Sequence, residues 1–187
     1  IVSYDLNFRS KLWSSKDAIA TTQPLVPYID CLIGNEEDFE QVLGYEAEGV
    51  DVHKAGALDV GPFKKMVERV AADYPNIKVV GTTLRGVKTA TINDWSAIMW
   101  VRGGGGGGTF YDGPNFENLE IEDRVGGGDG FASGFTYGFL TGAEPQQCVN
   151  LGVAHGAMLM STMGDTSQIT LEELTHVAGG GSARIKR

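Results

Sequence analysis

The chain has few of the side chains on which disulfide scaffolds and metal centres depend. It contains two cysteines, Cys31 and Cys148, and three histidines in 187 residues. The cysteines lie far apart in the sequence, and neither they nor the histidines have the close spacing of metal ligands. The composition therefore excludes a disulfide-rich scaffold and a cysteine–histidine metal site. We expect free, buried thiols in a reducing compartment, and hence a cytoplasmic protein.

Positive charge and long apolar runs are also scarce. Lysine and arginine number 15 against 24 aspartate and glutamate residues, which gives a formal net charge of −9. Nucleic-acid binding needs clustered basic side chains, so no nucleic-acid partner is expected. No apolar run reaches the length of a membrane span, so no membrane partner is expected. A small anionic ligand remains compatible with this charge, because one arginine can hold it locally.

The rest of the composition is that of a globular protein. Hydrophobic residues make up 42% of the chain, which is enough for a core, and the length suits one domain. The sequence starts with "IVSYDLNFR", without methionine and within an expected strand. We therefore expect residues 1–187 to be part of a larger domain without an internal boundary. A homo-oligomer is left open.

Hydrophobic periodicity predicts alternating strands and helices. Apolar runs predict strands at 1–7, 30–34 and 77–84, and antiparallel strands between 89 and 116. Capping residues and helical spacing predict helices at 14–29, 35–44, 62–74, 127–141, 144–163 and 171–178. Residues 49–61 are expected to form a loop. This alternation predicts an α/β fold with a mostly parallel sheet and helices on both faces.

Six consecutive glycines at 103–108 form the most obvious glycine-rich stretch. A phosphate-binding P-loop would need a lysine followed by serine or threonine, and would lead into a helix. This tract has neither feature. We expect it to form the mobile tip of the hairpin between the two antiparallel strands.

A second glycine stretch, "DRVGGGDGFASGF" at 123–135, combines flexibility with negative charge and a following helix. The glycines let the backbone approach an anion closely, and the helix dipole adds to their amides. Asp129 would repel this anion, unless its carboxylate takes the proton of an attacking hydroxyl group. The alternative is that Asp129 only caps its helix. Asp123 is expected to support the loop.

Four stretches, in order, resemble the PfkB carbohydrate kinases, the ribokinase-type family. The family's G-x-G-D signature appears as "GGGD" at 126–129, "DLNFR" resembles its D-x-N-x-R strand end, and "IGNEEDF" resembles its N-x-x-E segment. The tail "MLMSTMGDTSQITLEELTHVAGGGSARIKR" resembles the end of the family's 2-keto-3-deoxygluconate kinases. The resemblance covers nearly the whole chain, but only the C-terminal half of such a kinase.

The resemblance implies a ribokinase-like three-layer α/β/α sandwich with a mostly parallel sheet. Residues 1–187 would be the C-terminal, nucleotide-binding and catalytic part of a single kinase domain, and the N-terminal half would be missing. ATP and Mg²⁺ would be the cofactors. The reaction would be phosphorylation of a sugar-acid hydroxyl, and 2-keto-3-deoxygluconate would give its 6-phosphate.

The resemblance also implies roles for single residues. Asp129 would be the catalytic base. Arg9 and Asp165 would bind the sugar acid, since a guanidinium fork suits a carboxylate or keto oxygen. The anion hole around the phosphoryl group would be formed by Gly126, Gly127 and Gly128.

Nucleotide-facing residues follow from the same resemblance: Asn7, Asn35, Thr82, Thr83, Leu84 and Arg85. Asp38 stands where the family usually has glutamate and, being shorter, would reach Mg²⁺ through water. Simpler interpretations stay open, because Asn35 can cap a helix and Asp165 suits a turn. His155 lies on an apolar helix face, where a packed histidine is expected.

Two other functions are compatible with these motifs. One is another PfkB sugar kinase, acting on fructose or ribose. The other is a truncated nucleotide-binding module without catalysis. A Rossmann dinucleotide-binding domain is excluded, because its glycine fingerprint follows the first strand, whereas these glycines come late in the chain.

Overall fold

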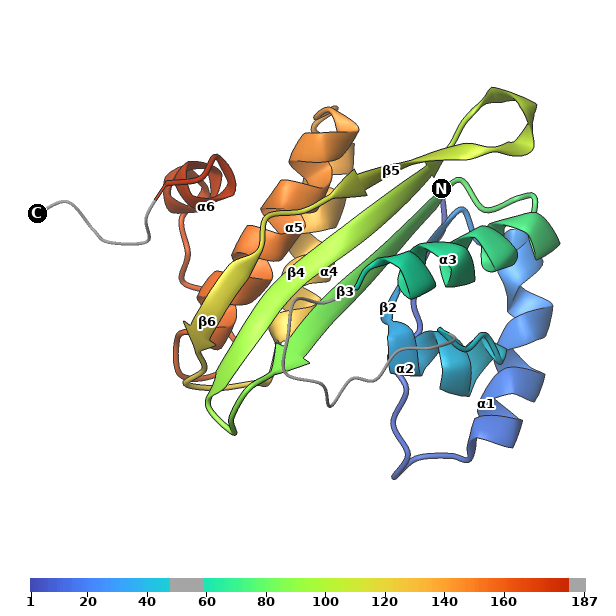
Figure 1. The fold of residues 1–187 in the computed structure, drawn as a ribbon, viewed down its shortest axis with the longest axis horizontal. Coiled ribbons are helices and arrows are strands. Elements are labelled where there is room, and N and C mark those ends of the chain that lie inside the picture. Colours follow the sequence, from blue (N-terminus) through green and yellow to red (C-terminus); the bar gives the residue numbers. More distant parts are fainter. Residues whose placement is uncertain (48–58, 182–187) are drawn as a thin grey trace, which may run out of the picture. The chain divides into compact units, whose positions relative to one another are not determined.

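The computed structural model describes residues 1–47 and 59–181 (Figure 1). Most of the expected 49–61 loop and the "SARIKR" end of the tail lie outside the described residues. The chain divides into two compact units. Of the described residues, the first comprises 1–47, 59–84 and 98–110, and the second comprises 85–97 and 111–181. Each unit is described by itself.

The described strands form one mixed sheet in the order β1-β2-β3-β4-β5, and β6 pairs with β4. Their bounds are β1 Ser3–Asp5, β2 Cys31–Asn35, β3 Val79–Val87, β4 Ile92–Arg102, β5 Gly108–Asp112 and β6 Phe116–Glu120. β1, β2 and β3 run parallel, whereas β6 is antiparallel to β4. Residues 88–91 alone join the neighbouring strands β3 and β4. This link is too short for a crossover, so these strands are antiparallel as well.

Apart from η3, a short turn within the glycine tract, the described helices lie where the sequence predicts them. Their bounds are α1 Ser15–Thr22, η1 Gln23–Tyr28, α2 Glu36–Asp38, η2 Phe39–Leu43, α3 Gly61–Asp73, η3 Gly104–Gly106, α4 Gly127–Leu140, α5 Pro145–Met160 and α6 Leu171–Ala178. Ser14 caps α1 by accepting a bond from the amide of Asp17. Prolines then convert its predicted continuation into the 3₁₀-helix η1. The predicted helix at 35–44 is a short α-helix that continues as the π-helix η2.

The core of the first unit joins its helices to its strands. Side chains of α1, η2, α3, β2, β3 and β4 share one buried cluster, which includes Ala18, Phe39, Met66, Val70, Leu32, Val80 and Trp100. Burying a large apolar side chain of this kind stabilises the fold by about 1.5–3 kcal/mol. The helices of this unit are therefore fixed against its parallel strands.

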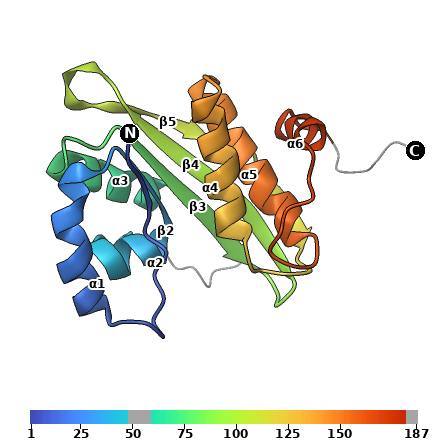
Figure 2. The same ribbon diagram turned by 180° about the vertical axis from the view of Figure 1, so that it is seen from behind.

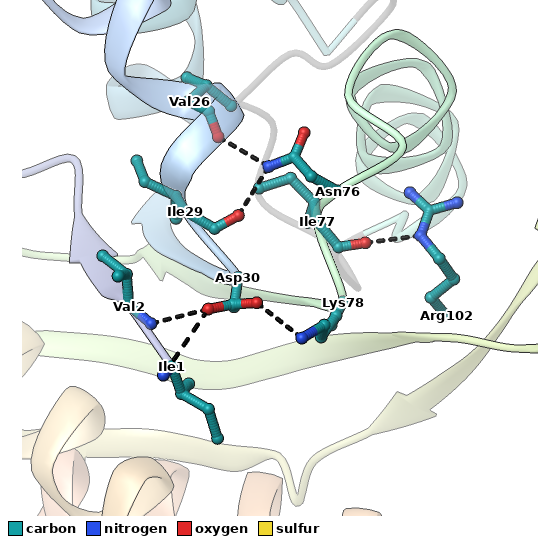
Figure 3. Close-up of polar contacts among 9 residues, drawn as sticks. All are labelled: Ile1, Val2, Val26, Ile29, Asp30, Asn76, Ile77, Lys78 and Arg102. Atoms are coloured by element: carbon teal, nitrogen blue, oxygen red, sulfur yellow. Dashed lines mark hydrogen bonds and ion pairs between the residues drawn. The ribbon is translucent and has the colours of Figure 1, made fainter.

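A polar cluster fixes the chain segments beside this core (Figure 3). The Asp30 carboxylate accepts a hydrogen bond from the amide of Val2 and forms an ion pair with Lys78, each at 2.8 Å. The bond from Lys78, followed by that from Val2, lowers the pKa of Asp30. Asn76 donates to two main-chain carbonyls at the end of η1, and Arg102 Nε donates at 2.6 Å to a carbonyl just before β3. These bonds lie where the parallel strands begin.

The second unit is built on the close pairing of α4 with α5 (Figure 2). A Cβ atom on Gly134 would lie 2.5 Å from the carbonyl oxygen of Leu151, so only glycine permits this approach. Trp95 of β4 is buried and donates from Nε1 to the carbonyl of Val153 in α5 at 3.1 Å. Strand β4 and the helix pair are thereby joined within this unit.

Several sequence predictions are confirmed at this level. Residues 103–107 of the glycine tract join β4 to β5, as the predicted hairpin requires, and include a short 3₁₀ turn, whereas the mobility of this tip stays a prediction. Both cysteines are free and buried. Each unit packs helices on strands, as an α/β fold requires. As an observation that does not test the predicted absence of a membrane partner, no helix within the described ranges combines the length and apolar character that crossing a membrane would require.

Candidate active site

Asp38 connects the segments that follow the first two strands. Asn35 ends β2, and its Oδ1 accepts a hydrogen bond from the amide of Asp38 (2.9 Å), while Asp38 Oδ2 accepts from the amide of Asn35 (3.0 Å). These two bonds form a capping box for α2. Asp38 Oδ1 accepts from the amide of Phe8, which follows β1, at 2.8 Å. One buried carboxylate thus joins the ends of two parallel neighbours.

Asn7 and Arg9 flank this anchored amide and are exposed. Asn7 has a φ of 39°, which is uncommon for a residue other than glycine, and its amide donates to Asp5 Oδ1 at 3.1 Å. Arg9 donates from one terminal nitrogen to the carbonyl of Phe8 at 2.8 Å. A guanidinium carries five N–H donors. This local bond therefore leaves donors with which Arg9 can bind a ligand.

The predicted nucleotide residues of β3 differ in exposure. Thr83 lies opposite Asn35 in β2. Thr82 is fully buried, and its hydroxyl has no hydrogen-bond partner among the described residues. Leu84 belongs to a small buried cluster, whereas Arg85 is exposed. A nucleotide contact from Leu84 would therefore come from the main chain rather than from the side chain.

The predicted Mg²⁺ contact of Asp38 must coexist with its structural role. Both carboxylate oxygens already accept main-chain amides, although each oxygen has a second lone pair. Across residues 1–47 and 59–181, no three His, Cys, Asp or Glu side chains are grouped to hold a metal ion. Mg²⁺ at nucleotide sites is held largely by phosphate oxygens and water. An ion that arrives with a nucleotide would not need such a group, and the Asp38 contact stays a prediction.

In the second unit, the glycines at 126–128 have three different roles. Gly126 adopts a φ of 85°, a left-handed conformation that favours glycine. A Cβ on Gly127 would lie 2.7 Å from the Met160 side chain, so a larger residue there would have to displace that side chain. Gly128 is exposed, and a Cβ at this position would have no neighbour within 4 Å. The chain therefore leaves open space beside the start of α4.

Asp129 is exposed in the first turn of α4, and Gly126 occupies the capping position. The alternative that Asp129 only caps the helix is therefore wrong. Asp165 lies beside the same turn, since a Cβ on Gly126 would be 3.5 Å from the Asp165 Cα. Asp123 supports this arrangement, as predicted. Its carboxylate accepts from the amide of Val125, just before the glycines (2.9 Å), and from the amide of Gly164 (3.3 Å).

His155 differs from the sequence prediction of a packed histidine. It is half-buried, with Nδ1 lying 2.8 Å from Ser133 Oγ and 2.9 Å from the carbonyl oxygen of Gly130. Its Nε2 lies 2.8 Å from Ser167 Oγ. Sequence reasoning missed this network, because its members come from α4, α5 and the segment after α5. One signal for this network was available in the sequence. Polar side chains occur there on helices whose mutual contact is otherwise rich in glycine.

Two groups of predicted residues are thus assembled, each within one unit. Asn7, Asn35, Asp38 and Thr83 lie close together in the first. The glycine turn, Asp129 and Asp165 lie close together in the second.

Residues 97–172 match the family model described as pfkB family carbohydrate kinase, a segment that includes the glycine turn, Asp129 and Asp165. The chain is also 36% identical to a solved 2-dehydro-3-deoxygluconokinase from Thermotoga maritima. That match has a TM-score of 0.84 and covers 96% of this chain and 51% of the other. Residues 97–172 therefore belong to a PfkB carbohydrate kinase domain. The predicted ribokinase-like α/β fold is thereby confirmed.

Curated relatives show which PfkB kinases are similar in sequence. A 2-dehydro-3-deoxygalactonokinase from Haloferax volcanii is 29% identical over 190 residues, which cover 99% of this chain and 49% of that protein. A cytidine kinase from Thermococcus kodakarensis is 33% identical over 116 residues, which cover 56% of this chain and 42% of that protein. The PfkB chain therefore spans about half the length of these relatives or less.

Proposed function

We propose that this PfkB chain acts in the ATP-dependent phosphorylation of a sugar-acid hydroxyl. The proposed substrate is 2-keto-3-deoxygluconate (2-dehydro-3-deoxygluconate), and the product is its 6-phosphate. The observation that carries the proposal is the exposed Asp129 carboxylate in the first turn of α4, next to open space at Gly128. Similarity to two proteins named as kinases of 2-dehydro-3-deoxy sugar acids supports this acceptor class.

In the proposed mechanism, Asp129 is the catalytic base. It takes the proton of the acceptor hydroxyl while the new oxygen–phosphorus bond forms and the bond to the leaving ADP breaks. Main-chain amides at 126–128 and the positive end of the α4 dipole stabilise the negative charge of the transferring group. Mg²⁺, when it is bound with ATP, neutralises phosphate charge.

The remaining roles belong to the same proposal. Arg9 binds the carboxylate or keto oxygen of the acceptor, and Asp165 accepts a hydrogen bond from an acceptor hydroxyl. Asp38 contacts Mg²⁺ through water, and the nucleotide is bound by Asn7, Asn35, Thr82, Thr83, Leu84 and Arg85. The cytoplasmic location and any homo-oligomer stay predictions.

The similarity to a cytidine kinase favours a second candidate function. A nucleoside presents a hydroxyl acceptor without a carboxylate, so its recognition would not need the guanidinium of Arg9. Phosphorylation of a neutral sugar such as ribose or fructose belongs to the same candidate.

The test is ADP formation by the 187-residue chain with Mg²⁺-ATP and one of five acceptors. These are 2-keto-3-deoxygluconate, its galactonate epimer, ribose, fructose and cytidine. Asp129→Asn keeps the size of the side chain but removes the base, so we expect kcat to fall by about 10²–10⁴-fold while ATP binding persists. Normal turnover by Asp129→Asn would exclude Asp129 as the base.

The acceptor preference separates the candidates. A preference for a keto acid supports the proposal, and Arg9→Lys should then raise KM for the keto acid more than for ribose. Equal changes in both KM values would contradict the role of Arg9. Preference for cytidine or ribose would support the second candidate. ATP binding without turnover of any acceptor would identify a nucleotide-binding module without catalysis.

A further inference from the structure

We propose that His155 is a positioning residue that holds the segment containing Asp165 against the first turn of α4. The inference rests on the proposed function, because Asp129 and Asp165 are the groups whose placement His155 would set. The imidazole stands on α5, contacts Gly130 directly after Asp129, and contacts Ser167 two residues after Asp165. It therefore links the two parts of the candidate site in the second unit.

The neighbours of the ring select one tautomer. The Gly130 carbonyl, 2.9 Å from Nδ1, can only accept, and Ser133 Oγ, 2.8 Å from Nδ1, donates to that same carbonyl. We therefore assign the proton to Nδ1, which faces these two acceptors. In the neutral ring, Nε2 is then an acceptor and receives the hydroxyl proton of Ser167 at 2.8 Å. Ser167 Oγ in turn accepts from the amide of Ile169 at 3.3 Å. Every polar atom in this chain of bonds has a compatible partner.

Among residues 1–47 and 59–181, few other hydrogen bonds hold the Asp165 segment. Residues 161–168 are exposed. On the N-terminal side of Asp165, Asp123 accepts from the amide of Gly164 at 3.3 Å, and on the C-terminal side His155 holds Ser167 at 2.8 Å. The bond between His155 and Ser167 is the shorter of the two, and the His155 ring is half-buried on α5. It therefore holds the segment more firmly than the bond to Asp123 does. Loss of this bond should free the segment without affecting the core.

The geometry does not make Ser133 a nucleophile, although its Oγ is 2.8 Å from His155 Nδ1. Ser133 Oγ donates to the carbonyl of Gly130 at 2.9 Å within its own helix. The other ring nitrogen faces a serine hydroxyl rather than a carboxylate that would orient a general base. The network therefore holds the Asp165 segment in place and does not activate a nucleophile.

Two variants break the same bond from opposite sides. His155→Asn keeps an amide donor near the Nδ1 position for Gly130 but cannot reach Ser167, and Ser167→Ala removes only the hydroxyl. Both should accelerate amide hydrogen exchange at residues 164–169 about tenfold and lower kcat roughly 10- to 100-fold, with KM for ATP unchanged. The double variant should be no worse than either single variant. Ser161→Ala is the matched control, because this hydroxyl bonds only locally to the Ala157 carbonyl, and it should change neither quantity.

The ring itself provides a readout that does not depend on turnover. ¹⁵N chemical shifts of His155 at pH 8 should show a protonated Nδ1, and a ring protonated only at Nε2 would overturn the inference. Unchanged exchange in both variants, or faster exchange with unchanged kcat, would also overturn it. If the wild-type chain shows no turnover, the proposed function fails, and the exchange rates and ring shifts alone decide whether His155 holds the segment.

Discussion

Asp38 shows how one residue type at one spacing can serve two purposes. The N-x-x-[D/E] pattern that resembles a family segment for metal and phosphate is also the spacing of a capping box. In the structure its carboxylate accepts two amides, one from Asn35 and one from Phe8. The bond to Phe8 spans 30 residues of sequence, so no local pattern could reveal it.

Asp38→Ala should lower the free energy of unfolding by about 2–4 kcal/mol, because two amides lose a charged acceptor. The measurement is urea unfolding without Mg²⁺ or nucleotide, which separates this structural role from metal binding. Glu37→Ala, in the same turn but exposed, should cost less than about 1 kcal/mol. A destabilisation of Asp38→Ala that appears only with Mg²⁺-ATP would contradict the structural role.

Cys31 should make stability depend on pH in the alkaline range. Burial raises the pKa of its thiol from 9.0 to about 11 in the folded chain. Between these two values the unfolded chain has lost a proton that the folded chain keeps, so stability falls as pH rises. Relative to Cys31→Ala, the wild type should lose up to about 2–3 kcal/mol between pH 8 and pH 11. Urea unfolding at several pH values tests this, and parallel pH curves for the two proteins would refute it.

At the scale of elements, helix ends were predictable where a local cap decides them. Thr170 and Glu173 form a capping box, and α6 has the predicted bounds Leu171–Ala178. The segment after Asn35 has a cap as well, yet it continues as a π-helix at Phe39–Leu43. Three of these five residues are buried in the core. Their packing is a tertiary effect, which periodicity alone does not describe.

The contact between α4 and α5 predicts opposite effects for two glycines of one helix. Gly134→Ala would place a Cβ 2.5 Å from the Leu151 carbonyl oxygen, and overpacking should cost about 1–3 kcal/mol despite the better helix propensity of alanine. Gly128→Ala meets no neighbour within 4 Å, so stability should be kept or rise by up to about 1 kcal/mol.

The order of the two variants should be reversed for activity, so that Gly128→Ala, the more stable variant, is the less active one. The methyl group of Gly128→Ala would enter the space proposed for the phosphoryl group, so ADP formation should fall although the fold is intact. Thermal unfolding and ADP formation measured together test this. Full activity of Gly128→Ala would show that the open space is not used.

At the scale of the whole molecule, β3 and β4 continue from one compact unit into the other. Because both units share these strands, we predict that residues 1–187 unfold in one cooperative transition, as a single domain should. Trp13 and Trp100 report on the first unit and Trp95 on the second. With 5-fluorotryptophan labelling, the three ¹⁹F resonances should change at the same urea concentration. An earlier transition at Trp95 would instead show two separately unfolding units.

The sequence by itself determined the α/β class, the order of most elements and the PfkB resemblance. These depend on periodicity, caps and short motifs, which are local properties of the chain. It also located Asp129 at the start of a helix after a glycine turn, because glycine and helix patterns are adjacent there.

Tertiary structure alone decided which atoms each polar group contacts. Asp38 meets Phe8, and His155 meets Ser167, through turns and helix packing that bring separate segments together. Tertiary structure also distinguished the three glycines. Gly126 adopts a left-handed backbone conformation, Gly127 packs closely against Met160, and Gly128 leaves open space. Hydrogen bonds and steric contacts act over a few ångströms in space, and sequence spacing does not encode those distances for residues far apart in the chain.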